Sequence, residues 1–420
     1  MDRSTTETTA GYTGVPTTIL QQMTDKSKHV PQGYKDSPLG IIPKEWEVKR
    51  ILDFAPLQRG FDLPTEKIVK GAYPVVYSNG ILNFHIEYKA KGPGVVTGRS
   101  GTIGKVTYVE SDYWPHNTSL WVTDFKGNNP KYVYYVYKYI GLSKFSSGSG
   151  VPTLNRNDVH VSKIAIPPIE EQGCIVKVLE LWDSAIEKQS ELIEKLKLRK
   201  RALMQQLLTG KKRLKVFGGE WKEVRLGDAG TAYGGLVNKN KEDFENGNAL
   251  FITYMNVFSN GKIDIDNLGQ VRILPSEKQE QVQYGDVFFT VSSETPDEVG
   301  MTSVLLNEVQ NTYLNSFCFG YRLNDFKSIV PVYASYLFRG DDFRKEMYKS
   351  AQGSTRFNIS KIEVLNMRIT IPSIEEQNAI ASVLVNADKE IEIQKQKLAA
   401  MQAQKKGLMQ VLLTGKRRIL

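Results

Sequence analysis

Apolar side chains recur at alternating steps of about four and three residues through two separated stretches of the chain. The first series is Ile175, Leu179, Trp182, Ile186, Gln189, Ile193, Leu196, Lys200, Leu203 and Leu207. The second series is Ile380, Leu384, Ala387, Ile391, Gln394, Leu398, Met401, Lys405, Leu408 and Leu412. This spacing is typical of helices that pack as a coiled coil. Glutamine and then lysine interrupt both series at the same two steps, which indicates that the stretches are related.

The two stretches are copies of one sequence. With an offset of 205, residues 166–214 and 371–419 are identical at 23 of 49 positions without a gap. Agreement over this length indicates an internal duplication. The copies end in nearly the same words, MQQLLTGKKR at 204–213 and MQVLLTGKRR at 409–418.

Each copy predicts one long helix. A proline precedes it, two glutamates lie in its first turn, and Gly210 or Gly415 follows it. Ser373 and Glu376 have the spacing of a capping box. A helix of roughly 40 residues would extend about 60 Å. The simplest arrangement packs the two helices on each other within one chain; the alternative packs each on another subunit.

The segments before the helices predict mixed α+β structure. Strand-like runs in the first are YPVVYS, GPGVVTG, KVTYV and SLWV. Those in the second are ALFITYMNV, GDVFFTV and SFCFGYRL. Helices are expected at 128–141 and 330–347, in matching places. The globular starts at 42–55 and 217–230 are also similar, whereas the interiors diverge.

We therefore expect an α+β protein with two globular mixed α/β domains. Two long helices would separate the domains and form an intramolecular antiparallel coiled coil with pseudo-two-fold symmetry. The expected division is 1–32 as a flexible N-terminal extension, 33–167 as globular domain 1, 168–214 as helix 1, 215–372 as globular domain 2, and 373–420 as helix 2.

The distribution of charge narrows the choice of partner. The net charge is +9, and residues 195–215 carry nine Lys or Arg and no acid. Residues 393–418 carry seven, again without an acid. Two basic segments at equivalent places suit contact with a polyanion. They equally suit two solvated helix ends whose charges complement the helix dipole.

Other features of the sequence argue against several classes of protein. There is no apolar run of 18 residues, so no membrane-spanning helix is expected, and the N-terminus lacks the features of a secretory signal. Cys174 and Cys318 cannot form a disulfide framework, and a reducing cytoplasm fits. The four histidines lie far apart, so no metal-binding spacing is present. We expect a cytoplasmic protein without a resident metal.

Several loops are rich in the residue types that contact bases and phosphates. The candidate DNA-binding residues of the first domain are Ser78, Asn79, Arg99, Ser100, Thr102, Lys105, Asn117, Thr118, Thr153, Asn155 and Arg156. Those of the second domain are Tyr254, Asn256, Ser292, Ser293, Thr295, Asn315, Ser354, Thr355 and Arg356. The competing interpretation is that these loops are ordinary turns.

No catalytic motif is present. GRSGTIGK at 98–105 has five residues between Gly98 and Gly104 where a phosphate loop needs four, and Val106 follows the lysine. The sequence also lacks a dinucleotide fingerprint and a nucleophile elbow. We expect no catalytic residues and no cofactor bound by this chain.

The duplicated region resembles that of type I restriction-modification specificity subunits. The resemblance rests on the repeated IPxIEEQ and LMQxLLTGK words and on the similar domain starts around Trp46 and Trp221. The segments 92–122 and 285–300 resemble two classes of target recognition domain in that family. The resemblance to the family covers roughly residues 33–420, and the first 30 or so residues depart from the family's pattern.

The resemblance implies a non-catalytic subunit in which each domain reads one half of a split site in double-stranded DNA. It further implies two methyltransferase subunits docked on the helices, joined by restriction (translocase) subunits. S-adenosylmethionine, ATP and Mg would be bound by those partners. Three alternatives stay open: a specificity subunit of a fused restriction-methylation enzyme, a coiled-coil scaffold that does not bind DNA, and an enzyme in its own right.

Overall fold

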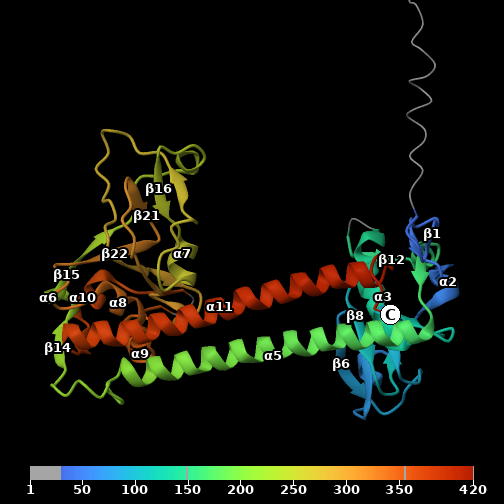
Figure 1. The fold of residues 1–420 in the computed structure, drawn as a ribbon. Coiled ribbons are helices and arrows are strands. Elements are labelled where there is room, and N and C mark those ends of the chain that lie inside the picture. The colour runs from blue at the N-terminus through green and yellow to red at the C-terminus, as the bar shows by residue number, and fades with distance from the viewer. Residues whose placement is uncertain (1–29, 148–149, 354–355, 420) are drawn as a thin grey trace, which may run out of the picture. The chain divides into compact units, whose positions relative to one another are not determined.

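The computed structural model describes residues 30–147, 150–353 and 356–419. The chain divides into two compact units (Figure 1). The first contains residues up to Ile186 and Ala400–Leu420, and the second contains Glu187–Ala399. Each unit therefore holds one recognition domain, the beginning of one long helix and the end of the other. Residues 1–29 of the expected N-terminal extension lie outside the described residues.

The long helices are α5 (Ile169–Leu207) and α11 (Ile374–Leu412), each of 39 residues. All twenty positions of the two apolar series are buried or half-buried. At the shared glutamine step, Gln189 Nε2 donates to Gln394 Oε1 at 2.8 Å. At the shared lysine step, Lys200 pairs with Asp388 and Lys405 with Asp183. These pairs run in opposite directions along the chain, which confirms an intramolecular antiparallel helix pair.

The repeated segments 204–213 and 409–418 contain the C-terminal end of each long helix. The chain that follows each helix then binds the other long helix. Thr209 Oγ1 donates to the Gln205 carbonyl at 2.6 Å, and Thr414 donates to the Gln410 carbonyl at the same distance. The following glycines adopt the left-handed conformation, with φ of 68° at Gly210 and 71° at Gly415. This turn directs the third residue after the glycine, Arg213 or Arg418, onto the start of the partner helix.

The arginine in each case neutralises a buried glutamate. Arg213 donates to Glu376 from Nε at 2.9 Å, and Arg418 donates to Glu171 from Nη2 at 2.9 Å. The side chains of both glutamates are 1% exposed. The pairs differ in one respect, because Trp46 Nε1 also donates to Glu171 at 3.1 Å. Glu376 accepts no such bond from a described tryptophan.

The expected capping box at the start of α11 is only half formed. Ser373 Oγ accepts a hydrogen bond from the Glu376 amide at 3.4 Å. The Glu376 carboxylate does not return to the Ser373 backbone, because Arg213 binds both of its oxygens. The ion pair between distant segments thus replaces a local contact.

The domain of the first unit consists of short strands and helices. They are β1 (Tyr34–Lys35), β2 (Ile42–Pro43), β3 (Glu47–Arg50), α2 (Ile51–Phe54), β4 (Leu57–Arg59), η1 (Thr65–Lys67), β5 (Tyr73–Tyr77), β6 (Gly80–His85), β7 (Gly94–Gly98), β8 (Val106–Val109), β9 (Trp114–Pro115), β10 (Ser119–Val122), α3 (Pro130–Ile140), η2 (Leu142–Phe145), β11 (Ser146–Ser147), β12 (Thr153–Leu154), α4 (Arg156–His160) and β13 (Lys163–Ile166). The antiparallel order β4-β10-β7-β8 forms one sheet and β6-β5-β9 another.

The domain of the second unit has a similar series. It comprises β14 (Lys222–Arg225), α6 (Leu226–Ala229), β15 (Gly230–Gly234), η3 (Lys241–Phe244), β16 (Ala249–Ile252), α7 (Tyr254–Ser259), β17 (Gly269–Val271), β18 (Val287–Thr290), β19 (Ser292–Ser293), η4 (Pro296–Glu298), β20 (Thr302–Val304), β21 (Thr312–Leu314), β22 (Cys318–Leu323), α8 (Pro331–Leu337), α9 (Asp341–Ser350), β23 (Phe357–Asn358), α10 (Lys361–Asn366) and β24 (Arg368–Ile371). Its sheets are β15-β22-β18-β20 and β17-β16-β21.

The two domains share one topology although their sequences diverge. Strands β4, β10, β7 and β8 correspond in order and pairing to β15, β22, β18 and β20. The smaller sheets correspond as well, because β5 pairs parallel with β9 as β16 does with β21. A two-stranded ribbon, β3 with β13 or β14 with β24, joins each domain to a long helix. The expected α+β class and duplicated architecture are confirmed.

Two expected elements are corrected. The helix expected at 330–347 is two helices, because Gly340 is extended and Arg339 binds one backbone carbonyl of β20 and three at the end of α7. The strand expected from Ala249 to Val257 ends at Ile252. Thr253 caps α7 there by accepting from the Asn256 amide at 3.2 Å. Local capping therefore overrides the β propensity of the run.

Both domain cores continue into the helix pair. In the first unit the core includes Ile175, Leu179 and Leu412, and in the second it includes Ile380, Leu384 and Leu207. A repeated glutamine anchors the domain helix beside each core. The Gln172 side chain accepts from the Asn129 amide at 2.9 Å, and the Gln377 side chain accepts from the Val330 amide at 2.9 Å. The repeated IEEQ motif thus joins each long helix to its domain.

We predict that Arg213→Ala destabilises the protein more than Arg418→Ala. The first change leaves the Glu376 carboxylate buried without its arginine, whereas Glu171 retains the Trp46 bond. An uncompensated buried charge costs roughly 3–5 kcal/mol. For domains of this size that would lower Tm by roughly 6–20 °C in scanning calorimetry. Arg418→Ala should lower Tm by about half as much.

The double variant Arg213→Ala with Glu376→Gln is the control for this prediction. It removes the unpaired charge and should recover most of the lost Tm, because a neutral amide is less costly to bury than a carboxylate. If Tm does not recover, loss of arginine packing rather than the buried charge causes the destabilisation.

Candidate nucleic-acid interfaces

The polar loops of the first domain converge at one end of its larger sheet. The Arg99 and Ser100 amides both donate to the Thr118 carbonyl, at 2.8 and 3.1 Å. The Leu154 amide donates to the Arg99 carbonyl at 2.7 Å, which brings β12 beside the end of β7. A cavity of about 330 Å³ lies there, lined by Arg59, Arg99, Leu120, Thr153, Leu154, Asn155 and Arg156. Four of the candidate residues therefore line one cleft, which we call the first polar cleft.

The other candidates of this domain lie on the neighbouring turns. Ser78 and Asn79 form the turn between β5 and β6, and the Ser78 amide lies 3.4 Å from Thr118 Oγ1. Lys105 Nζ donates to the Asn79 carbonyl, which ties the loop that carries Thr102 to the same turn. These side chains are exposed or half-buried and surround the first polar cleft.

Several candidate side chains are already engaged within the domain. Asn155 caps α4 by accepting from the Asn157 amide at 3.0 Å, and Asn117 donates to Asp62. The Asn117 hydrogen bond is the main reason that the pKa of Asp62 is lowered, and the charge of Arg59 adds to it. Arg156 differs, because its guanidinium makes no hydrogen bond or ion pair with the described residues. An exposed, unpaired guanidinium is suited to an anionic or base-edge partner.

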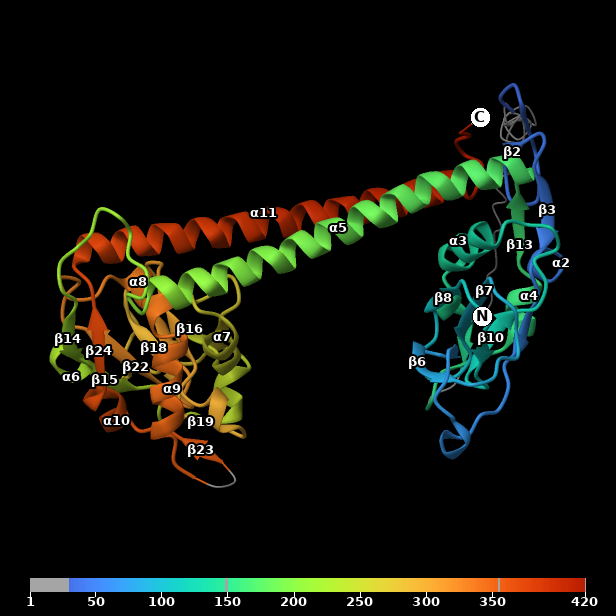
Figure 2. The same cartoon turned by 90° about the horizontal axis from the view of Figure 1, so that it is seen from below.

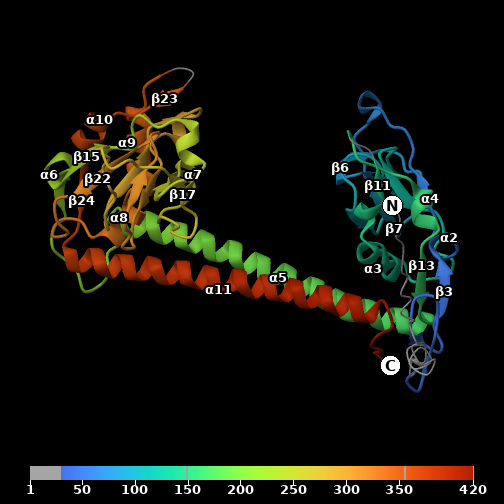
Figure 3. The same ribbon diagram turned by 90° about the horizontal axis from the view of Figure 1, so that it is seen from above.

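The second domain has a cleft beside β19, which follows β18 as Ser100 follows β7, but other positions line it than in the first domain. It has a volume of about 410 Å³ and is lined by Tyr254, Met255, Phe258, Ser292, Ser293, Glu294, Glu298, Phe317 and Arg356. Strand β19 pairs with β23 at its edge. Figures 2 and 3 show β23 on the side of the domain away from α11. We call this the second polar cleft, and four candidate residues line it.

The walls of the second polar cleft combine apolar and polar groups. Tyr254 stacks on Phe258 with 5.8 Å between ring centroids, and its hydroxyl donates to the Ser292 carbonyl at 3.1 Å. Phe317 is 62% exposed, and its amide is held by Asn315 Oδ1 at 2.8 Å. Arg356 is exposed, with no hydrogen bond or ion pair to its guanidinium from the described part of the chain.

Two further candidates hold the loop beside this cleft. Ser293 Oγ accepts from the Thr295 amide at 3.2 Å, and the Thr295 hydroxyl donates to Glu298 at 2.8 Å. These contacts fix the course of the loop, and they leave Thr295 exposed at its tip.

The structure corrects one candidate and leaves two undescribed. Asn256 is 2% exposed, and its amide donates to the carbonyls of Asp264 and Asn267 at 2.8 and 3.0 Å. It stabilises a loop and is not accessible to DNA. Ser354 and Thr355 lie outside the described residues. The role of the remaining candidates as DNA contacts stays a prediction.

Sequence reasoning did not select two basic residues of interest, Arg59 and Lys361. Arg59 lines the first polar cleft. Lys361 follows the N-cap Ser360 of α10 as Arg156 follows the N-cap Asn155 of α4. Extending the offset of 205 upstream of the helices pairs Arg156 with Lys361, so the repeat itself contained this signal.

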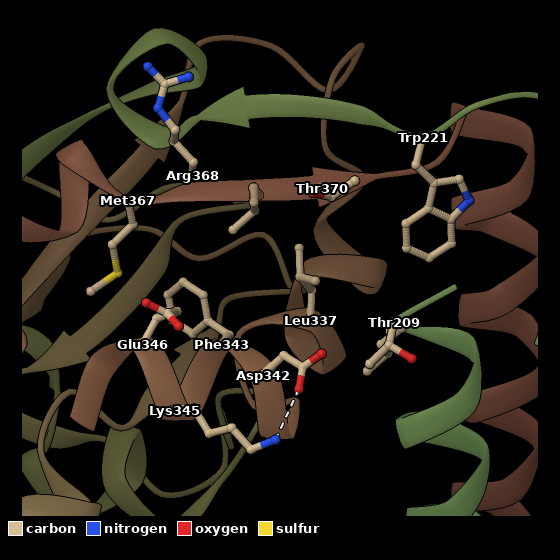
Figure 4. Close-up of a pocket in the computed structure, with 12 residues that line it drawn as sticks. Thr209, Trp221, Leu337, Asp342, Phe343, Lys345, Glu346, Met367, Arg368 and Thr370 are labelled. Atoms are coloured by element: carbon tan, nitrogen blue, oxygen red, sulfur yellow. Dashed lines mark hydrogen bonds and ion pairs between the residues drawn. The ribbon is translucent and has the colours of Figure 1, made fainter. Parts of the chain in front are cut away.

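Another cavity, of about 490 Å³, lies near the end of α5 in the second unit (Figure 4). Trp221 and Thr209 line it together with Asp342, Lys345 and Arg368. Trp221 Nε1 is buried without a partner among the described residues. The equivalent Trp46 is fully buried and bonded to Glu171.

Within the described residues, no group of three or more His, Cys, Asp or Glu side chains could hold a metal ion. No helix of the described chain is long and apolar enough to cross a membrane. Two similar domains, each with a polar cleft and each carried by a duplicated helix pair, define a protein with two recognition domains.

Comparisons with known proteins agree with this class. The sequence signature described as "Type I restriction modification DNA specificity domain" matches residues 43–198 and 218–403. The MjaVIII specificity subunit of Methanocaldococcus jannaschii is 24% identical over 414 residues, covering 90% of this chain and 94% of that protein. The putative MjaX specificity subunit of the same organism is also 24% identical, over 92% of this chain and 97% of its own length.

Solved structures show the same fold. A chain from a study of complex assembly and conformational transition of the type I restriction-modification system aligns with a TM-score of 0.61, at 16% identity, over 90% of this chain and 99% of that chain. The type I S subunit from M. genitalium aligns with a TM-score of 0.51, also at 16% identity, over 88% and 96%.

The protein belongs to the type I restriction-modification DNA specificity family, and both of its domains match the family signature. It is therefore a type I specificity subunit with two recognition domains.

We predict that Arg156→Ala and Arg356→Ala each impair recognition of a different half-site. A bidentate arginine contact to a base contributes about 1–3 kcal/mol of discrimination. The affinity of the assembled complex should fall roughly 5- to 150-fold, measured by titration of duplexes in which one half-site at a time is randomised. Randomising the half-site that the altered domain reads should then cause little further loss.

The salt dependence of binding distinguishes a phosphate contact from a base contact. An arginine that binds only phosphate would weaken all sequences equally and would lower the salt slope by about one. Equal loss at both half-sites would contradict the assignment of one cleft to one half-site.

Proposed function

We propose that the chain reads a split sequence in double-stranded DNA, with one half read by each polar cleft. The observation that supports this most directly is the repetition of one strand topology in two domains, each of which has a polar cleft. The clefts differ in character. The first is lined by three arginines, whereas the second combines aromatic rings, serines, two glutamates and one arginine. Two different linings on one topology suit two different half-sequences.

We further propose that two methyltransferase subunits dock on the helix pair and that restriction (translocase) subunits join them. Large apolar side chains are exposed on the long helices away from the seam, among them Leu181 at 71%, Leu198 at 66% and Ile393 at 60%. Such side chains on a helix surface are suited to a protein partner. The offset of 205 relates these residues to Asn386, Ala403 and Lys188, so they are not repeated between the helices. The proposal of two copies of one partner therefore rests on the duplicated helix pair and not on these side chains.

The chemical steps are proposed to take place on those partners, which makes this chain a non-catalytic subunit. S-adenosylmethionine would bind to the methyltransferases, and ATP and Mg to the restriction subunits. Removal of the target base from the helix would also fall to the methyltransferases. We place this activity in the cytoplasm, where free thiols such as those of Cys174 and Cys318 persist.

Methylome sequencing of the source cells, with the gene intact, deleted and restored, tests this function. We expect a methylated motif of two specified halves around an unspecified gap that disappears on deletion and returns on restoration. A motif that survives deletion, or the absence of any gene-dependent motif in cells that express the partner subunits, would contradict the proposal.

A further inference from the structure

In the first unit, one tyrosine of the recognition domain contacts both long helices through a shared aspartate. Tyr135 of α3 donates from its hydroxyl to Asp183 Oδ2 of α5 at 2.6 Å. Lys405 of α11 donates to the other oxygen of the same carboxylate. The Lys405 ammonium also lies 5.2 Å from the centroid of the Tyr135 ring. Three side chains from three elements therefore form a closed set of contacts.

The second unit contains the same set. Tyr336 of α8 donates to Asp388 Oδ2 of α11 at 2.6 Å, and Lys200 of α5 pairs with Asp388 Oδ1. The Lys200 ammonium lies 5.5 Å from the Tyr336 ring centroid. Lys262 adds a contact here, because it donates to the Tyr336 hydroxyl at 2.8 Å. We call these two sets the first and second Tyr-Asp-Lys triads.

The triads are equivalent although their tyrosines come from divergent sequences. Asp183 and Asp388 are related by the offset of 205, as are Lys200 and Lys405. Tyr135 and Tyr336 lie outside the duplicated stretch, on domain helices that correspond in topology. The helix repeat thus supplies an acid and a base, and each domain supplies its own tyrosine.

Stability alone does not account for these contacts. Lys200 and Lys405 occupy positions of the seam that are otherwise mostly apolar, and Lys405 is 7% exposed. The aspartates are partly exposed, Asp183 at 43% and Asp388 at 34%, and an ion pair with a solvent-exposed partner typically contributes about 1 kcal/mol or less. What it adds is direction, because each hydrogen bond and ion pair needs a defined geometry. A carboxylate held from both sides fixes the angle of the domain helix on the helix pair.

In the first triad, the pKa shifts of the carboxylate and the phenol favour the protonation states that their hydrogen bond requires. Burial raises the pKa of Asp183, but the hydrogen bonds from Lys405 and Tyr135 outweigh it and bring the pKa below its ordinary value. Burial, together with the hydrogen bond to Asp183, raises the pKa of Tyr135 well above its ordinary value. The carboxylate is therefore charged and the phenol remains a donor.

We propose that the Tyr-Asp-Lys triads are positioning devices that hold each recognition domain at a fixed angle on the helix pair and so restrict the gap accepted between the half-sites. This inference rests on the proposed function, because a gap matters only if both domains read one DNA molecule. One added base pair moves a half-site by about 3.4 Å along the duplex and rotates it by roughly one tenth of a turn. A domain held at a fixed angle cannot follow that displacement.

The test uses Tyr135→Phe and Tyr336→Phe in the complex with the methyltransferase subunits. Binding is measured on duplexes that carry the gene-dependent motif with its natural gap and with the gap longer or shorter by one base pair. Each variant should bind the natural duplex within about threefold of the unaltered complex. The penalty for the altered gaps should fall at least threefold, because the phenyl ring retains packing but loses the bond to the aspartate.

Matched controls lie on the same helices. Tyr137 of α3 donates to the Ala55 carbonyl inside the domain, and the Tyr333 hydroxyl of α8 is buried without a partner in the described chain. Tyr137→Phe and Tyr333→Phe remove a buried hydroxyl without touching a triad, so the gap penalty should not change. If these controls relax the penalty as much as the triad variants do, general loosening of the domain is the cause and the proposal is overturned.

Lys405→Met provides a second approach to the first triad. It keeps an unbranched side chain on the seam and removes the charge, and Asp183 can be hydrated because its side chain is 43% exposed. It should relax the gap penalty as Tyr135→Phe does. An unchanged penalty in both variants would overturn the proposal while leaving the proposed function intact. Sequence-independent binding by the unaltered complex would overturn both.

Discussion

Two copies of one amphipathic helix can bury their apolar stripes by packing on each other, and this pairing is the constraint on which the other features depend. Because the pairing is antiparallel, each domain receives the start of one helix and the end of the other. The core of the first unit accordingly contains Ile175 and Leu412, and that of the second contains Ile380 and Leu207. Neither domain could complete its core without a segment from a distant part of the chain.

Polar residues specify this pairing more narrowly than the apolar stripe does. Gln189 meets its own copy Gln394, and the Asp-Lys pairs recur on either side of that contact. An apolar seam alone tolerates a shift of register, whereas a misplaced lysine or glutamate would be buried without a partner. The arginines beyond Gly210 and Gly415 add the final contact, each on the first turn of the opposite helix. The repeated IEEQ and LLTGK segments thus contribute the residues on the two sides of these contacts.

The two domains keep one strand order but differ in side chains, loops and added helices, because α7 and α9 have no counterpart in the first domain. Each domain has a polar cleft, and the lining changes from arginine-rich to partly aromatic. The attachment of each domain to its long helix is also kept. It uses Gln172 and Tyr135 in the first unit and Gln377 and Tyr336 in the second. A protein built in this way can change what a cleft recognises without altering how the cleft is carried.

The sequence by itself determined the duplication, the helix pair and the α+β class, because a period of 3.5 residues and an offset of 205 are visible without coordinates. It also located loops that lie at both clefts. Only the tertiary structure decided which polar residues remain accessible. Asn256 satisfies its hydrogen bonds inside a loop, and Arg339 interrupts a helix by binding distant carbonyls. Such outcomes depend on partners far away in the chain, and local patterns carry no information about them.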